Sequence, residues 1–201
     1  NQSPQLRTIP LARGDGTPIS GFPLPLRTCG ATGEKEYFRQ PDGTVGVRYD
    51  DAGMDSEGLA VAANGDFWVS DEYGPFIARY DQQGREQARF GPCAGAGVTK
   101  GLPAVFAKRR ANRGMEGLSL SPSGKVIGMM QSPLDNPRAA GRASRALRLL
   151  LVDPANPGVG SKQYVYLLEA AANLSSEVIA LDDGNFLVLE RDGLFPGVPG
   201  V

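Results

Sequence analysis

The chain has 201 residues, enough for one large domain or two small ones with a substantial buried core. Its 21 Lys and Arg against 22 Asp and Glu give a net charge of −1, so no overall field favours nucleic acid or an anionic membrane surface as a partner. Histidine is absent, which excludes Ser-His-Asp and Cys-His catalytic sets, histidine phosphatases and the usual zinc sites. Acid–base or metal chemistry must therefore use carboxylates, Lys, Arg, Tyr or hydroxyls.

The first part of the chain, residues 1–53, is rich in Gly, Pro and polar residues and contains strand-like pieces near 18–27 and 44–50. It begins with Asn rather than Met, which fits the removal of a signal peptide, and the sequence has no apolar run long enough to span a bilayer. Cys29 and Cys93 match no metal-ligand spacing. They form either one disulfide, which export would favour, or two free buried thiols.

A regular pattern begins near residue 57. We expect strands at 58–62, 66–71, 76–81 and 86–90, each separated from the next by a tight turn with the sequences "ANGD", "YGP" and "QQGR". Four short antiparallel strands in sequence form a meander, which is the unit of a β-propeller.

This unit recurs. Segments 56–72, 115–132 and 176–192 each contain a Glu, an alternating apolar strand, a glycine turn and a second apolar strand that ends in a polar cluster. The pattern predicts an all-β fold, a β-propeller of four-stranded antiparallel blades that is incomplete here, because propellers usually need at least four blades. The expected divisions are an N-terminal segment with a possible partial blade (1–53) and propeller blades over 54–201, in units near 54–110, 111–172 and 173–201, the last truncated.

The three repeated glutamates, Glu57, Glu116 and Glu177, stand at the start of the first strand of each unit. If that strand is innermost, they converge at one end of the propeller channel, where unpaired carboxylates would repel one another. A hard divalent cation relieves this repulsion, and the available oxygen ligands favour Ca²⁺, with Mg²⁺ second. Asp55 adds a fourth candidate ligand. The alternative is that each Glu caps a turn or pairs with arginine between blades.

Further polar residues lie near these glutamates. We expect the acids at the ends of the second strands to transfer protons, and neighbouring polar residues to bind an anionic substrate. The candidates for proton transfer are Asp71, Glu72 and Glu190. The candidates for substrate binding are Asn112, Arg113, Gln131 and Arg191.

The segments "DSEGLA", "FWVSDEYGP", "NRGMEGLSLSPSG", "QSPL" and "SSEVIALDDGNFLVLERD" together resemble the phytase-like family, the "esterase-like activity of phytase" proteins. The resemblance implies a propeller-like, usually exported protein that hydrolyses phosphate or other esters. It points to Asp55, Glu57, Asp71, Glu72, Glu116, Glu177, Glu190 and Arg191 as the active centre. A more distant likeness is to the Ca²⁺-binding lactonase propellers of the gluconolactonase type. Gln131 departs from the pattern, since the other two units carry an acid there.

The leading hypothesis is therefore a secreted or periplasmic hydrolase of small anionic esters, with phosphoesters favoured, that uses a carboxylate-bound divalent metal in a propeller channel. The rival hypothesis is a non-catalytic, Ca²⁺-stabilised propeller that serves as a binding or structural scaffold. Neither requires a nucleic acid or a membrane span, and both leave the oligomeric state open.

Overall fold

The computed structural model describes residues 7–156 and 160–192. Within these ranges the regular structure is almost all β. The exceptions are a short 3₁₀ helix, η1 (Ala104–Lys108), and a single turn of α-helix, α1 (Arg138–Arg142). The all-β fold class is thus confirmed. Among the described residues, no helix has the length and apolar character needed to cross a membrane.

The first sheet has the strand order β3-β4-β5-β6-β7. Its first four strands form the expected antiparallel meander, and the short fifth strand adds in parallel to β6. The strands are β3 (Ser56–Val61), β4 (Phe67–Asp71), β5 (Ile77–Tyr80), β6 (Glu86–Gly91) and β7 (Lys100–Gly101). Strand β7 was not predicted, because two residues carry no alternation pattern.

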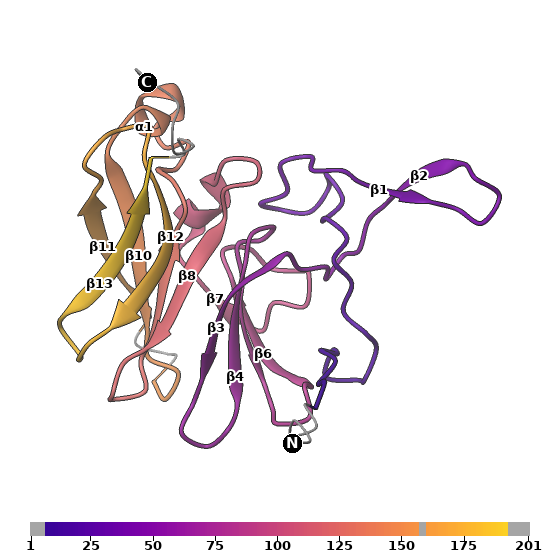
Figure 1. Ribbon diagram of the computed structural model, residues 1–201, viewed down its shortest axis with the longest axis horizontal. Coiled ribbons are helices and arrows are strands. Elements are labelled where there is room, and N and C mark those ends of the chain that lie inside the picture. Colours follow the sequence, from indigo (N-terminus) through magenta and orange to yellow (C-terminus); the bar gives the residue numbers. More distant parts are fainter. Residues whose placement is uncertain (1–6, 157–159, 193–201) are drawn as a thin grey trace, which may run out of the picture.

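The second sheet has the order β11-β10-β9-β8, and the third consists of β12 and β13, with every pair antiparallel (Figure 1). The strands are β8 (Met115–Leu120), β9 (Val126–Met130), β10 (Ala146–Val152), β11 (Lys162–Leu167), β12 (Leu174–Ala180) and β13 (Phe186–Arg191). Residues 193–201, which the sequence assigns to the last unit, lie outside the described residues.

The N-terminal segment forms one hairpin, β1 (Glu36–Arg39) and β2 (Val45–Arg48), which projects from the body of the molecule (Figure 1). Strand β2 lies within the strand expected at 44–50. The piece at 18–27 forms no named strand, only a single bridge between Ala12 and Pro18. Three prolines in this piece, at positions 18, 23 and 25, cannot donate to a ladder of backbone hydrogen bonds.

Both faces of the first sheet are covered. On one face, Trp68, Ile77 and Phe90 share a hydrophobic core with the second sheet, and this core extends to Val178 of the third. On the other face, the sheet packs against the N-terminal segment, with core residues Leu24, Met54, Val69, Tyr73, Phe76, Ala78 and Tyr80. The N-terminal segment is therefore part of the same packed body.

The first strands of the three sheets, β3, β8 and β12, lie side by side, and two glycines permit this. A Cβ atom on Gly58 would lie 2.6 Å from the Leu118 Cβ and 2.7 Å from the Glu116 carbonyl oxygen. A Cβ on Gly117 would lie 2.8 Å from the Val178 nitrogen. Such distances are too short for a side chain. The glycine that follows Glu57 and Glu116 therefore allows equivalent positions of neighbouring strands to meet.

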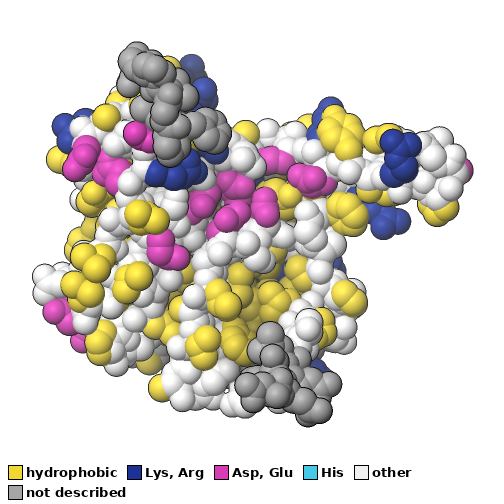
Figure 2. Space-filling model, viewed as in Figure 1, with side chains coloured by type: hydrophobic (Ala, Val, Ile, Leu, Met, Phe, Trp, Pro, Cys, Tyr) yellow, Lys and Arg dark blue, Asp and Glu magenta, His cyan; other side chains and the backbone are white. Residues whose placement is uncertain are grey.

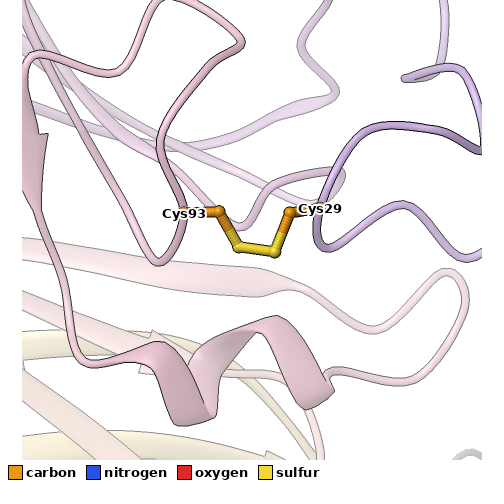
Figure 3. Close-up of a disulfide and its surroundings, with 2 residues drawn as sticks. All are labelled: Cys29 and Cys93. Carbon is orange, nitrogen blue, oxygen red and sulfur yellow. A yellow bond between two sulfur atoms is a disulfide. The ribbon is translucent and has the colours of Figure 1, made fainter.

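One disulfide joins the N-terminal segment to the body. Cys29 and Cys93 are bonded, with their Cα atoms 5.9 Å apart and a sequence separation of 64 (Figure 3). Of the two alternatives that the sequence leaves open, the disulfide is therefore the one present. It attaches the segment that precedes β1 to the loop that follows β6.

Replacing both Cys29 and Cys93 by serine is expected to lower the free energy of unfolding by about 2–4 kcal/mol, because the closed loop restricts the unfolded chain. Urea unfolding of the oxidised wild type and the double variant measures this loss. Reduced wild type serves as the control and should match the variant. Equal stability of oxidised wild type and variant would contradict the expectation.

Candidate functional site

Three carboxylates meet where β3 begins and β4 ends. Asp55, Glu57 and Glu72 each place one oxygen so that these atoms all lie within 4.8 Å of one another. Asp55 precedes β3, Glu57 lies in it, and Glu72 follows β4. A β-bulge between Ser56 and Leu59 interrupts the pairing of the two strands at Glu57, and bulges of this kind redirect side chains. Glu72 is buried, Asp55 half-buried and Glu57 exposed.

Asp71 lies beneath this cluster and has no exposed surface. Its Oδ1 accepts the Asp55 N–H at 2.8 Å, and its Oδ2 accepts the N–H groups of Gly74 at 2.7 Å and Phe76 at 3.3 Å. Burial raises the pKa of Asp71 to about 6 despite these hydrogen bonds. The Asp71 side chain therefore fixes the backbone on both sides of the cluster.

Glu116 lies beside the cluster and makes a side-chain contact of its own. The Gln131 Nε2 donates to the Glu116 Oε1, and the Ser70 hydroxyl donates to the Glu116 backbone oxygen at 3.2 Å. Gln131 is buried, with 4% of its surface exposed, and among the described residues its Oε1 has no hydrogen-bond partner. A buried carbonyl oxygen without a donor is free to accept a hydrogen bond or to contact a cation.

Two other expected residues have different surroundings. The Glu177 Oε1 accepts the N–H groups of Leu118 at 3.2 Å and Val178 at 2.8 Å, so this carboxylate joins β8 to β12. Glu190 accepts hydrogen bonds from the Tyr166 hydroxyl, the Glu169 N–H and the Asn173 amide. Burial would raise the pKa of Glu190, but these hydrogen bonds outweigh it and lower the pKa.

The expected substrate-binding residues border the cluster. Arg113 and Arg191 both lie close enough to Glu116 for their charges to favour its ionised form. The Arg191 Nε donates to the Ser176 hydroxyl at 2.7 Å, and Arg113 donates to the Asn112 carbonyl at 2.7 Å. The Asn112 N–H donates to Glu34 at 3.2 Å.

Sequence reasoning missed Glu34 and Arg109. The Arg109 side chain is completely buried; its Nε donates to the Tyr73 carbonyl at 2.8 Å and its Nη1 to the Glu34 Oε1 at 2.6 Å. Burial alone would raise the pKa of Glu34, but hydrogen bonds from Arg109 and Thr32 lower it to about 2. The Arg109 charge also acts on Asp55 and Glu72. Neither residue belongs to the repeat, so the sequence offered no signal for this pair.

Burial and mutual repulsion raise the pKa values of the clustered acids. Burial and then Glu116, Asp55 and Asp71 raise the pKa of Glu57 to about 7. Burial, with repulsion from Asp55 and Glu57, raises that of Glu72 to about 7, although the Gly114 N–H opposes the shift. Burial and Glu72 raise that of Glu116 to about 6. Without a cation the cluster therefore retains protons near neutral pH.

The spacing of these oxygens fits a hard divalent cation. Ca²⁺ binds oxygen at about 2.4 Å, so two ligand oxygens on opposite sides of one ion are about 4.8 Å apart. The oxygens of Asp55, Glu57 and Glu72 lie within that limit. One Ca²⁺ could therefore contact all three.

In chelator, the free energy of unfolding is expected to fall as the pH rises from about 4.5 to about 7.5. The folded-state pKa values of Glu57, Glu72 and Glu116 lie above the ordinary value of 4.5, so their stabilising contribution is full below that value and is lost as the pH passes through 6 to 7. Urea unfolding across this range measures the slope. Ca²⁺ should stabilise increasingly as the pH rises, and a flat profile in chelator would contradict the expectation.

A cavity of about 460 Å³ lies at the other end of the same three strands. Val61, Trp68, Leu120, Ser121 and Ala180 line it, together with Ala62, Ala63, Pro122 and Gly124, and this lining contains no carboxylate. None of the acidic residues that the sequence singles out lies in this lining.

Comparison with known proteins agrees with the resemblance drawn from the sequence. A family profile described as "Phytase-like: Esterase-like activity of phytase" matches residues 4–200. A curated relative from Arthroderma benhamiae, described as "Uncharacterized secreted protein", is 25% identical over 234 residues. That match covers 93% of this chain and 45% of the relative, so the chain spans less than half of the relative's length.

Proposed function

The chain belongs to the phytase-like family, and from this premise we propose that it is an exported hydrolase of phosphoric or other esters. The observation that carries the proposal is the meeting of Asp55, Glu57 and Glu72 at a spacing that suits one divalent cation. Export is supported by the disulfide and by the description of the relative as a secreted protein.

Ca²⁺ is the proposed ion, with Mg²⁺ second, because the ligand set is purely oxygen and includes carboxylates of unequal burial. Asp55, Glu57 and Glu72 would hold it. Glu116 is a further candidate, because its charge acts on Glu57. Glu177 would join only by giving up its two backbone N–H donors. The bound ion would polarise a phosphoryl or carbonyl oxygen.

The protein's own residues would bind the substrate and move the proton. Arg113 and Arg191 would bind the anionic part of the ester, with Asn112 and Gln131 beside them. Of the three acids expected to transfer protons, we retain Glu72, which would accept the proton through a carboxylate oxygen that does not contact the ion; its pKa of about 7 holds without the ion, and a bound cation would lower it. Asp71 accepts hydrogen bonds from three backbone N–H groups, and Glu190 accepts them from two side chains and one backbone N–H. We therefore do not assign proton transfer to these two residues.

Hydrolysis assays with Ca²⁺ and with chelator test the function. We expect Ca²⁺-dependent release of p-nitrophenol from p-nitrophenyl phosphate, faster than from p-nitrophenyl butyrate. If neither ester releases p-nitrophenol faster than in buffer alone, the proposed hydrolase activity is refuted. If chelator then still lowers the melting temperature, a Ca²⁺-stabilised scaffold remains the explanation.

We also propose that the three sheets are propeller blades, with units near 54–110, 111–172 and 173–201 after an N-terminal segment. The side-by-side contact of β3, β8 and β12 supports this, because the first strands of neighbouring blades adjoin in a propeller. An experimental structure tests this proposal, and sheets that do not lie around a common axis would refute it.

A further inference from the structure

A tight turn places two arginines opposite each other next to the carboxylate cluster. Arg110 and Arg113 form an antiparallel bridge, and Asn112 between them adopts a left-handed backbone with φ of 51°. Residues directly opposite in such a bridge carry their side chains on the same face, and like charges there repel. The turn is anchored from below, because the buried Arg109 donates to the Arg110 carbonyl at 3.1 Å.

A third arginine reaches the same place from another element. Asp135, which precedes α1, donates its N–H to the Lys108 carbonyl at 2.8 Å, and its side chain pairs with Arg142 of α1. This connection brings Arg142 close to Arg110. Burial, then Arg142, then Arg113 lower the pKa of the Arg110 guanidinium, while Asp135 opposes the shift. Arg110, Arg113 and Arg142 therefore lie near enough for the charges of Arg113 and Arg142 to act on Arg110.

Arg110, Arg113 and Arg142 form an arginine cluster, and the turn that carries Arg110 and Arg113 adjoins the carboxylates at its next residue. The residue after Arg113, Gly114, directs its N–H at the Glu72 Oε1 at 3.4 Å, and a Cβ on Gly114 would lie 2.2 Å from the Glu72 Cα. In Figure 2 a group of Lys and Arg side chains borders the main group of Asp and Glu side chains. An acidic region and a basic region thus lie side by side.

We propose that the arginine cluster is an oxyanion subsite that binds a phosphate group, even without a divalent cation. Arginine forms planar, paired hydrogen bonds with phosphate oxygens, and a tetrahedral anion has enough oxygens to contact several guanidinium groups at once. Arg110 and Arg142 are new members of the site, beside Arg113. The assignment of this phosphate to the substrate rests on the proposed hydrolase, whereas the binding itself does not.

Isothermal titration with inorganic phosphate, in chelator near neutral pH, tests the subsite. Replacing Arg110 or Arg142 by glutamine removes one charge-assisted contact and is expected to weaken phosphate binding about tenfold each. The matched control is Arg148→Gln on β10, which makes the same charge change at a guanidinium that donates to Gln163. This control should bind phosphate like the wild type.

Three results would refute the proposed subsite. These are a wild type that does not bind phosphate, equally tight binding by the wild type and both arginine variants, and an Arg148→Gln variant that weakens phosphate binding as much as Arg110→Gln and Arg142→Gln do. If acetate bound as tightly as phosphate, the proposed recognition of a tetrahedral anion would be refuted. Thermal unfolding of each variant checks the fold, and Arg142, being exposed, keeps the test valid if Arg110→Gln unfolds. Because chelator is present and no ester is used, failure of hydrolysis leaves this test unaffected.

Discussion

Replacing Glu57 by glutamine is expected to weaken Ca²⁺ binding by up to about 100-fold and to remove most Ca²⁺-dependent hydrolysis. Glutamine keeps the size of the side chain but removes one of the three clustered carboxylates, and Glu57 is the exposed member, so its substitution leaves the core intact. Isothermal titration with Ca²⁺ measures the affinity, and the initial rate with p-nitrophenyl phosphate measures the activity.

The matched control for this substitution is Glu190→Gln. Glu190 undergoes the same chemical change, but its hydrogen bonds run to Tyr166, Glu169 and Asn173 rather than to the cluster. It should leave the Ca²⁺ affinity unchanged. A loss of turnover with unchanged affinity would restore to Glu190 the proton transfer that the sequence suggests. Unchanged Ca²⁺ affinity in Glu57→Gln would refute the proposed cation site.

The strands of the repeat could be predicted from sequence because their signals are local. Alternating apolar residues bounded by glycine turns locate β3 to β6, β8, β9, β12 and β13. What the sequence missed depends on contacts between distant segments. Strand β7 exists because residues 100–101 meet β6 in parallel, and the N-terminal segment is ordered by packing under the first sheet.

The site was predictable to the extent that it follows the repeat. Asp55 and Glu57, expected as metal ligands, and Glu72, expected to transfer protons, belong to the best-preserved copy, and the structure brings these three together. The third copy carries Val178 where the first two have glycine, and its Glu177 bonds to the backbone of β8 and β12. The valine at this position is a sequence signal that the surroundings of Glu177 differ from those of Glu57 and Glu116. The Glu34–Arg109 pair joins segments 75 residues apart, and no local sequence pattern predicts such a contact.

Replacing Gly58 by alanine is expected to lower the free energy of unfolding by about 1–3 kcal/mol and to weaken Ca²⁺ binding as well. The added Cβ would meet the Leu118 Cβ, the Glu116 carbonyl oxygen and the Ser70 hydroxyl, all within 2.7 Å. Two of these atoms belong to β8, so β3 and β8 must move apart. Because Glu57 adjoins Gly58, this movement also shifts a carboxylate of the cluster.

The control for Gly58→Ala is Gly101→Ala, where no atom lies within 4 Å of the added Cβ. There the substitution mainly restricts the unfolded chain, so stability should stay the same or rise by up to about 1 kcal/mol. Urea unfolding and Ca²⁺ titration compare the two variants. If Gly58→Ala behaved like Gly101→Ala, the close approach of β3 and β8 would be wrong, and the propeller proposal would lose its support. If Gly58→Ala lost stability but kept full Ca²⁺ affinity, β3 and β8 would pack as described. The cation site would then not depend on the spacing of these strands.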